Sequence, residues 1–202
     1  MNLDKLYKLQ AELDNHIWDK HKTLEKMTKE ELLDNTILAL LVEVGELANT
    51  TRCFRHWSTK GMMKKEIVLE ELADVWHFYL SIGNQINFRL RDGNIDANNP
   101  AYYGLSLYTR TDTFNYLYFL GGNFSSKYPK ITKGYYIKFG AILAMLGEML
   151  GFTDAEVEQA YLKKHEENYR RQREGYRDWE TDRKSTRLNS SNSAKSRMPS
   201  SA

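Results

Sequence analysis

Apolar side chains recur at helical spacing along this chain, most clearly between Thr28 and Phe54. From Ile37 onward they fall at i, i+3, i+4, i+7, i+10 and i+11: Ile37, Leu40, Leu41, Val44, Leu47 and Ala48. That period places them on one face of a helix. The segment opens with Thr28 and, three residues later, Glu31, a capping box that is typical of a helix start. Such a face is buried most readily against other helices.

The same period predicts further helices at residues 3–20, about 65–88, 132–151 and from Thr153 onward, where a second capping box begins. Residues 91–100, RDGNIDANNP, have loop composition. Residues 105–122 are aromatic and rich in threonine, and they fit either a short helix or an extended segment. With only 3 prolines in the chain, the predicted fold class is all-α, a helical bundle of five or six helices.

A chain of 202 residues is long enough for one domain with its own core and short for two, and we expect that domain to span residues 1–181. Cys53 is the single cysteine, which excludes an intramolecular disulfide and suits a reducing compartment. No apolar run approaches the roughly 18 residues that span a bilayer. We therefore expect a cytoplasmic protein with no membrane partner.

Residues 182–202 share no periodicity with the rest of the chain. Their first ten, DRKSTRLNSS, resemble one reading frame of a common sequencing-library adapter, so we expect a non-native, disordered tail joined to a truncated gene. The alternative is a natural disordered tail. This tail holds five of the 29 basic and one of the 27 acidic residues, which leaves residues 1–181 with a net charge of −2. No nucleic-acid partner is expected on that charge.

Two pairs of acidic residues interrupt apolar helices: Glu43 with Glu46, and Glu71 with Asp74. Like charges at this spacing are neighbours on a helix and repel by roughly 0.2 to 0.5 kcal/mol a pair. Such pairs are common by chance in a chain with 27 acidic residues, and by spacing alone a solvated helix face explains them. Their setting is less ordinary, because a short connection makes the two helices antiparallel neighbours.

If the pairs face each other, four carboxylates form a cage that is strongly unfavourable without a cation. Hard oxygen ligands in that number suit Mg²⁺ or Mn²⁺, the usual partner of a polyphosphate. Glu70 competes with Glu71 for the inward position. His77 lacks a second histidine at ligand spacing, so we expect a hydrogen-bonded core histidine there.

Two further segments carry cations. In the connection after the second helix, basic and aromatic residues alternate: Arg52, Phe54, Arg55, His56, Trp57 and Lys60. Such a mix can stack a base and hold phosphate, although it is also ordinary in an amphipathic loop. Near the end of the helical part, Lys164, Asn168 and Arg171 fall on one helix face and could hold a triphosphate, or could simply be solvated.

Taken together, these segments resemble the all-α, dimeric dUTP diphosphatases of the all-α NTP pyrophosphatase superfamily. The resemblance covers about residues 8–178 and lies in four motifs: KLQAEL at 8–13, EVGE at 43–46, ELAD at 71–74 with the following VWHFYLS, and KxxxNxxRQxxGY, which is met by Lys164, Asn168, Arg171, Gln172, Gly175 and Tyr176. The last motif is the most specific, since other members of the superfamily share only ExxE and ExxD.

The resemblance implies that Glu43, Glu46, Glu71 and Asp74 bind Mg²⁺, with Mn²⁺ as a substitute, and that dUTP is hydrolysed to dUMP and pyrophosphate. It implies catalytic roles for Glu43, as the general base, and for Glu46. Phosphate would contact Lys164, Asn168, Arg171 and Lys60, and the base and sugar would contact Gln10, Trp57, Asn84 and Tyr176. A homodimer is also implied, and dUDP is a second conceivable substrate.

Two departures from the family pattern stand out. Asp14 occupies a position where the family usually has asparagine, which bears on a base or sugar contact. Beyond Tyr176 the chain lacks the family's acidic closing segment. A related pyrophosphatase acting on dCTP or a modified nucleotide is therefore the alternative within the class, and a helical adaptor without enzymatic activity is the alternative outside it.

Overall fold

The computed structural model describes residues 1–20, 26–90, 109–127 and 129–174. The chain divides into two units, Met1–Asn168 and Tyr169–Ala202, and the tail expected at 182–202 lies outside the described residues. In the described part there are six helices: α1 (Leu3–Lys20), α2 (Lys29–Thr51), α3 (Lys65–Gln85), α4 (Arg110–Gly122), α5 (Pro129–Met149) and α6 (Asp154–Glu174). The predicted all-α bundle of five or six helices is confirmed.

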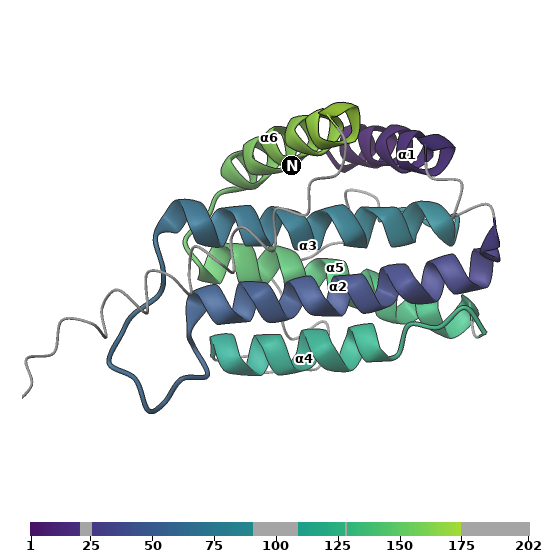
Figure 1. Ribbon diagram of the computed structural model, residues 1–202. Coiled ribbons are helices and arrows are strands. Elements are labelled where there is room, and N and C mark those ends of the chain that lie inside the picture. Colours follow the sequence, from purple (N-terminus) through teal and green to yellow (C-terminus); the bar gives the residue numbers. More distant parts are fainter. Residues whose placement is uncertain (21–25, 91–108, 128, 175–202) are drawn as a thin grey trace, which may run out of the picture. The chain divides into compact units, whose positions relative to one another are not determined.

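Helices α2 to α5 form the centre of the first unit (Figure 1). α2 packs against α3 on one side and α4 on the other, and α5 packs against α3 and α4. α1 covers another side of α3, and the part of α6 up to Asn168 also contacts α3 and α1 through side chains. α3 is therefore the central helix of this unit, and most of its residues are buried.

Capping boxes begin three helices, two of which the sequence predicts. Thr28 and Glu31 bond reciprocally at the start of α2, and Thr153 and Glu156 do so at α6. The ambiguous segment 105–122 contains α4, because Thr109 forms the same box with Asp112. The helix predicted to run to about residue 88 ends earlier, at Gln85.

Large aromatic rings fill the core where α1, α3 and α5 meet. Tyr7 and Tyr136 join α1 to α5 through their hydroxyl groups, which lie 2.7 Å apart. This junction requires a glycine on α3, since a Cβ on Gly83 would lie 2.2 Å from the Tyr136 hydroxyl oxygen. The close approach fixes α1 on α3, and α1 supplies part of the cavity described below.

Among the described residues, no single helix is long and apolar enough to cross a membrane. Thr132–Met149 and Asp154–Glu174 pass that test only as a bent pair, by length and composition alone.

Candidate metal and nucleotide site

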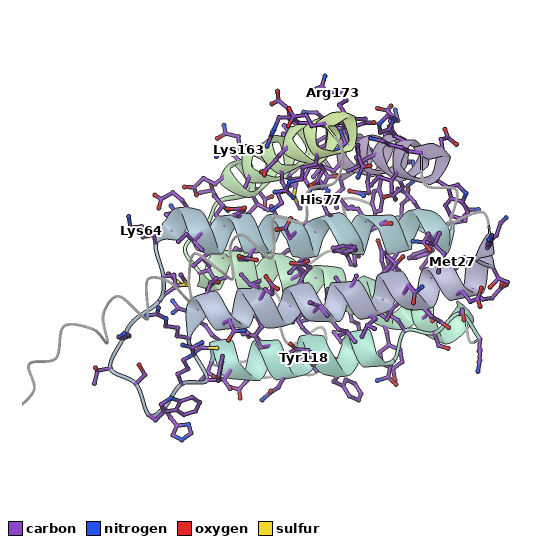
Figure 2. The ribbon with its side chains drawn as sticks, viewed as in Figure 1. Met27, Lys64, His77, Tyr118, Lys163 and Arg173 are labelled. Carbon is purple, nitrogen blue, oxygen red and sulfur yellow. The ribbon has the colours of Figure 1, made fainter. Side chains whose placement is uncertain are left out.

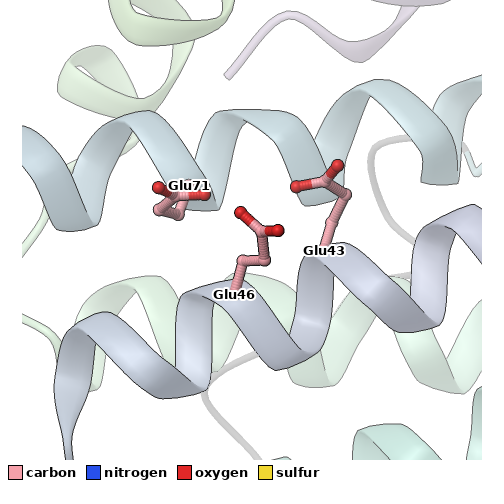
Figure 3. Close-up of side chains that lie close together, drawn as sticks. All are labelled: Glu43, Glu46 and Glu71. Carbon is pink, nitrogen blue, oxygen red and sulfur yellow. The ribbon is translucent and has the colours of Figure 1, made fainter. Parts of the chain in front are cut away.

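Three carboxylates converge between α2 and α3. Glu43 and Glu46 lie on one face of α2 because they are three residues apart, and Glu71 lies opposite on α3 (Figure 3). Each offers a ligand oxygen, and these oxygens lie within 4.8 Å of one another. Glu71 is buried and the other two are half-buried. We call Glu43, Glu46 and Glu71 the glutamate cluster.

The charge of the cluster is concentrated enough to shift the titration of Glu43. Burial raises the pKa of Glu43, and the nearby charges of Asp74, Glu46 and Glu71 raise it further, to about 8. Lys164 acts in the opposite direction but does not offset them. A positive charge placed among these oxygens would therefore stabilise the ionised form.

Lys164 on α6 lies beside the cluster. Its Nζ is 2.7 Å from Asp74 Oδ2 and 3.2 Å from Glu70 Oε1. Burial lowers the pKa of Lys164, but the charges of Asp74 and Glu70 outweigh burial, so that pKa lies above its usual value. The ion pairs thus hold a buried ammonium group, only 5% exposed, at the edge of the carboxylates.

The sequence predicts four carboxylates in one cage, and the structure brings three of them together. Asp74 is close enough to raise the pKa of Glu43, but it is bonded to Lys164. Glu71 takes the inward position, whereas Glu70 lies on the side of Lys164. Three carboxylates with a fourth alongside are a donor set of hard oxygens, which fits Mg²⁺ or Mn²⁺.

A cavity of about 460 Å³ lies between α1, α2 and α3. Its polar lining includes Asp14, Asn15, Thr36, Ser81, Asn84, Gln85 and Arg89, and its aromatic lining includes Trp18 and Phe78. On α3 Ser81 follows Asp74 by seven residues, and on α2 Thr36 precedes Glu43 by seven. The cavity therefore lies about two helical turns, roughly 10 Å, from the carboxylates along both helices.

Behind this cavity, a buried hydrogen-bond network joins α1, α3 and α6. Gln10 Oε1 accepts a hydrogen bond from the Tyr161 hydroxyl at 2.8 Å and lies 2.7 Å from His77 Nδ1. The Gln10 side-chain amide in turn donates to Asp14 Oδ1 at 2.7 Å. The His77 ring stacks on Tyr161, with ring centroids 4.0 Å apart. We call Gln10, His77, Tyr161 and Asp14 the amide network.

His77 lies on the side of α3 that faces α1 and α6 (Figure 2). Burial, followed by the charge of His165, lowers the pKa of His77 to about 3, so its ring is neutral at ordinary pH. Because Gln10 Oε1 is an acceptor, Nδ1 carries the proton. The prediction of a hydrogen-bonded core histidine is confirmed.

The remaining predicted contacts are scattered. Asn84 lines the cavity, whereas Gln10 lies behind Asp14. Trp57 and Lys60 lie in the exposed connection between α2 and α3, where the Trp57 ring packs on His56. Lys164 and Asn168 lie on α6 in the first unit, and Arg171 lies on α6 in the second unit. Tyr176 is outside the described residues.

Sequence reasoning did not select Tyr161, Ser81 or Gln85. A signal for Ser81 exists, since it lies four residues after His77 and seven after Asp74 on one helix face. Tyr161 precedes Lys164 by three residues and shares its face in the same way. Gln85 gives no comparable signal.

Clustered carboxylates with a buried ammonium group beside them suit the hydrolysis of phosphate anhydrides, because they could hold a metal ion next to a phosphate-binding cation. The sequence profile of the family described as dUTPase matches residues 2–176. Because the match spans most of the chain, the chain belongs to the dUTPase family and is a dUTP diphosphatase. The family typically uses a divalent metal, and the glutamate cluster fits one. A search among curated proteins found no match.

Proposed function

We propose that the glutamate cluster, with Asp74, binds Mg²⁺ during dUTP hydrolysis, and that Mn²⁺ can replace it. The observation that supports this proposal is the convergence of three carboxylate oxygens within 4.8 Å of one another between two antiparallel helices. Holding carboxylates this close costs free energy, because their charges repel and are partly desolvated. A bound divalent cation offsets that cost. Bound Mg²⁺ would neutralise phosphate charge and lower the pKa of water.

In this mechanism Glu43 is the general base. Its carboxylate would accept a proton from the attacking water as the water oxygen bonds to phosphorus and the anhydride bond between the α- and β-phosphates breaks, which gives dUMP and pyrophosphate. The raised pKa of Glu43 without metal, about 8, supports this role, because its carboxylate binds a proton near neutral pH. Glu46, one turn further along α2, keeps the ligand oxygens on the same side of the helix.

The phosphate chain would be bound by cations and amide donors from α6 and the connection. Lys164 is already held beside the carboxylates by Asp74. Asn168 follows it by four residues on the same helix, and Arg171 by seven. We assign these three, with Lys60 of the connection, to the phosphates, because ammonium, guanidinium and amide groups donate to phosphate oxygens.

The nucleoside would occupy the cavity between α1, α2 and α3. Its two-turn separation from the carboxylates leaves room for the sugar and the first phosphate. Asn84 and the aromatic rings of Phe78 and Trp18 line it and could contact the base. Gln10 acts through Asp14, and we assign Trp57 and Tyr176 to the base and sugar by the family resemblance.

We also propose that the protein is a homodimer and works in the cytoplasm. α2 and α4, which lie side by side, expose apolar side chains: Leu38 at 62%, Val42 at 52%, Tyr118 at 40% and Phe119 at 54%. Exposed apolar side chains on two neighbouring helices favour an interaction site, and a second copy is the partner that the family implies.

For the dimer, Leu38→Glu should convert the protein to a monomer, because it places a charge in the apolar contact. Sedimentation velocity measures the change, with Lys29→Glu, an exposed position at the start of α2, as the control. A monomeric parent, or a dimer that survives in Leu38→Glu, would contradict the assignment.

The proposed reaction is tested by pyrophosphate release from dUTP, dCTP, dTTP and UTP, each with Mg²⁺, with Mn²⁺ and with EDTA. We expect release from dUTP with either metal and none with EDTA. Undiminished release in EDTA would remove the metal from the proposal. UTP measures sugar selection, and dTTP measures tolerance of a methyl group on the base.

A further inference from the structure

The Lys164 ammonium group is bonded to two carboxylates of α3. Its Nζ lies 2.7 Å from Asp74 Oδ2 and 3.2 Å from Glu70 Oε1. Asp74 and Glu70 are four residues apart, so their side chains lie on the same face of α3. Lys164 reaches that face from α6 and is only 5% exposed. Two carboxylates therefore share one buried ammonium group.

The two carboxylates differ in their surroundings. Asp74 is 16% exposed, lies close enough to Glu43 to raise its pKa, and is the fourth ligand of the proposed metal site. Glu70 is outside the glutamate cluster and is 34% exposed. It lines a groove of about 350 Å³ between α3 and α6, which Lys164 also lines. A metal ion in the cluster would thus engage Asp74, whereas Glu70 lies on the groove side of Lys164.

Metal binding would weaken the attraction between Asp74 and Lys164. A carboxylate that coordinates a divalent cation has much of its charge neutralised by that cation, which also repels a nearby ammonium group. A buried ammonium group is stable only beside an opposite charge. Glu70 already lies at bonding distance from Lys164 and can supply that charge.

We propose that Glu70 is a positioning residue, which retains Lys164 when a metal ion coordinates Asp74 and so keeps the ammonium group where it can bind the phosphate chain. This inference rests on the proposed metal site and the proposed phosphate contact of Lys164. An ammonium group has three N–H donors, so it can bind Glu70 and a phosphate oxygen at the same time. Glu70 acts through Lys164 and touches neither the metal nor the substrate.

The α6 backbone near Lys164 is anchored separately. Tyr161, three residues earlier, bonds Gln10 through its hydroxyl at 2.8 Å, and its ring stacks on His77 with centroids 4.0 Å apart. The lysine side chain itself is a flexible four-carbon stem. With the backbone held, the place of the ammonium group is therefore decided by its carboxylate partners.

The first test is calorimetric binding of Mg²⁺ to the full chain without substrate, at one pH. Glu70→Gln keeps the size of the side chain and removes its charge. We expect the Kd for Mg²⁺ to rise about five-fold, because releasing Asp74 from Lys164 costs more when Glu70 cannot take over the ammonium group.

A double-mutant cycle shows whether Glu70 acts through Lys164. In a Lys164→Met background there is no ammonium group to retain, so Glu70→Gln should have little effect on Mg²⁺ affinity. An effect of equal size in both backgrounds overturns the inference, since Glu70 would then act on the metal by its own charge.

The second test is the hydrolysis of dUTP at saturating Mg²⁺. Glu70→Gln should raise KM about ten-fold, the size of one charge-assisted hydrogen bond to phosphate. It should leave kcat nearly unchanged, because Lys164 binds the phosphate chain in the substrate and in the transition state. A purely structural role for Glu70 would lower Tm without moving KM or the Mg²⁺ affinity, and that result overturns the inference.

Glu66→Gln is the matched control. Glu66 is an exposed acid four residues earlier on α3 and lines the same groove, so this variant should bind Mg²⁺ and dUTP as the parent does. Parental Mg²⁺ affinity and KM in Glu70→Gln would reject the role of Glu70 and keep the proposed reaction. A parent that binds no Mg²⁺, or releases pyrophosphate equally in EDTA, would instead reject the metal site, and the role of Glu70 with it.

Discussion

The polar groups on two sides of α3 differ in how well their charges and hydrogen-bonding groups match those of their neighbours. Toward α2, Glu71 meets Glu43 and Glu46, which carry the same charge. Toward α1 and α6, His77 meets Gln10 and Tyr161, whose donors and acceptors complement one another. Polar groups that satisfy each other stabilise a fold, whereas like charges held together by the surrounding core are arranged for a ligand. The substitutions and conditions below test that distinction.

The largest effect is expected in the glutamate cluster. Glu46→Gln should lower dUTP turnover by at least about 100-fold, because it removes a ligand charge next to the general base. Folding without metal should be unaffected or improved, since one repulsion is relieved. Pyrophosphate release and thermal melting measure the two effects, with Glu30→Gln, an exposed acid on α2, as the control. A variant that keeps parental turnover would show that the glutamate cluster has no role in hydrolysis.

Lys164→Met should destabilise the protein. It removes the ammonium group from between Asp74 and Glu70, both only partly exposed. Breaking a pair of this partial burial costs about 2 kcal/mol, and for a chain of this length that lowers Tm by about 4 to 8 °C. Lys163→Met, exposed on the same helix, should melt like the parent. Equal melting of the two variants would show that the ion pairs contribute nothing.

The metal-free protein should lose stability as pH rises from 6.5 to 8.5. Glu43 has a pKa of about 8 when folded and an ordinary one when unfolded, so its contribution is complete at low pH and is lost as pH rises through 8. His77 does not interfere, because its contribution is lost only as pH falls below its ordinary pKa. The melting temperature should fall by a few degrees over this pH interval, and added Mg²⁺ should restore it.

Glu43→Gln supplies the comparison for that experiment. Its melting temperature should change less with pH across the same interval, because the titrating group is absent. An unchanged slope would assign the pH dependence to another residue.

The smallest effect is expected in the amide network. Tyr161→Phe removes one donor to Gln10 and should cost about 1 kcal/mol, or 2 to 4 °C in Tm. Turnover of dUTP should change only a few-fold, because the Gln10 oxygen keeps its contact with His77. Tyr118→Phe, on the exposed side of α4, is the control. A loss of turnover as large as that in Glu46→Gln would erase the difference between the two sides of α3.

Much of the fold was predictable from the sequence because local signals were strong. Apolar periodicity and capping boxes located α1, α2 and α6, with starts that agree with the structure. The segment containing α4 was ambiguous because its aromatic residues suit a helix or a strand, and the Thr109–Asp112 box resolves it only once its side chains are seen to bond.

The candidate site was predictable only in part. Spacing placed Glu43 and Glu46 on one face of a helix. It could not show that Lys164 would bond Asp74, which lies about ninety residues earlier in the chain. The cavity depends on the packing of α1 against α3, which no spacing along the chain encodes. The contact of Asp14 with Gln10 differs, because the two residues lie four apart on α1, a spacing at which their side chains are neighbours.

The crowding around Glu43 has a further consequence for the heat of metal binding. Near neutral pH most of the Glu43 side chains hold a proton, since the pKa is about 8. A cation that binds there displaces this proton, which the buffer then takes up. The measured heat will therefore include the ionisation of the buffer. Titrations with Mg²⁺ in two buffers of different ionisation enthalpy would count the protons released and report, without any substrate, whether Glu43 faces the ion.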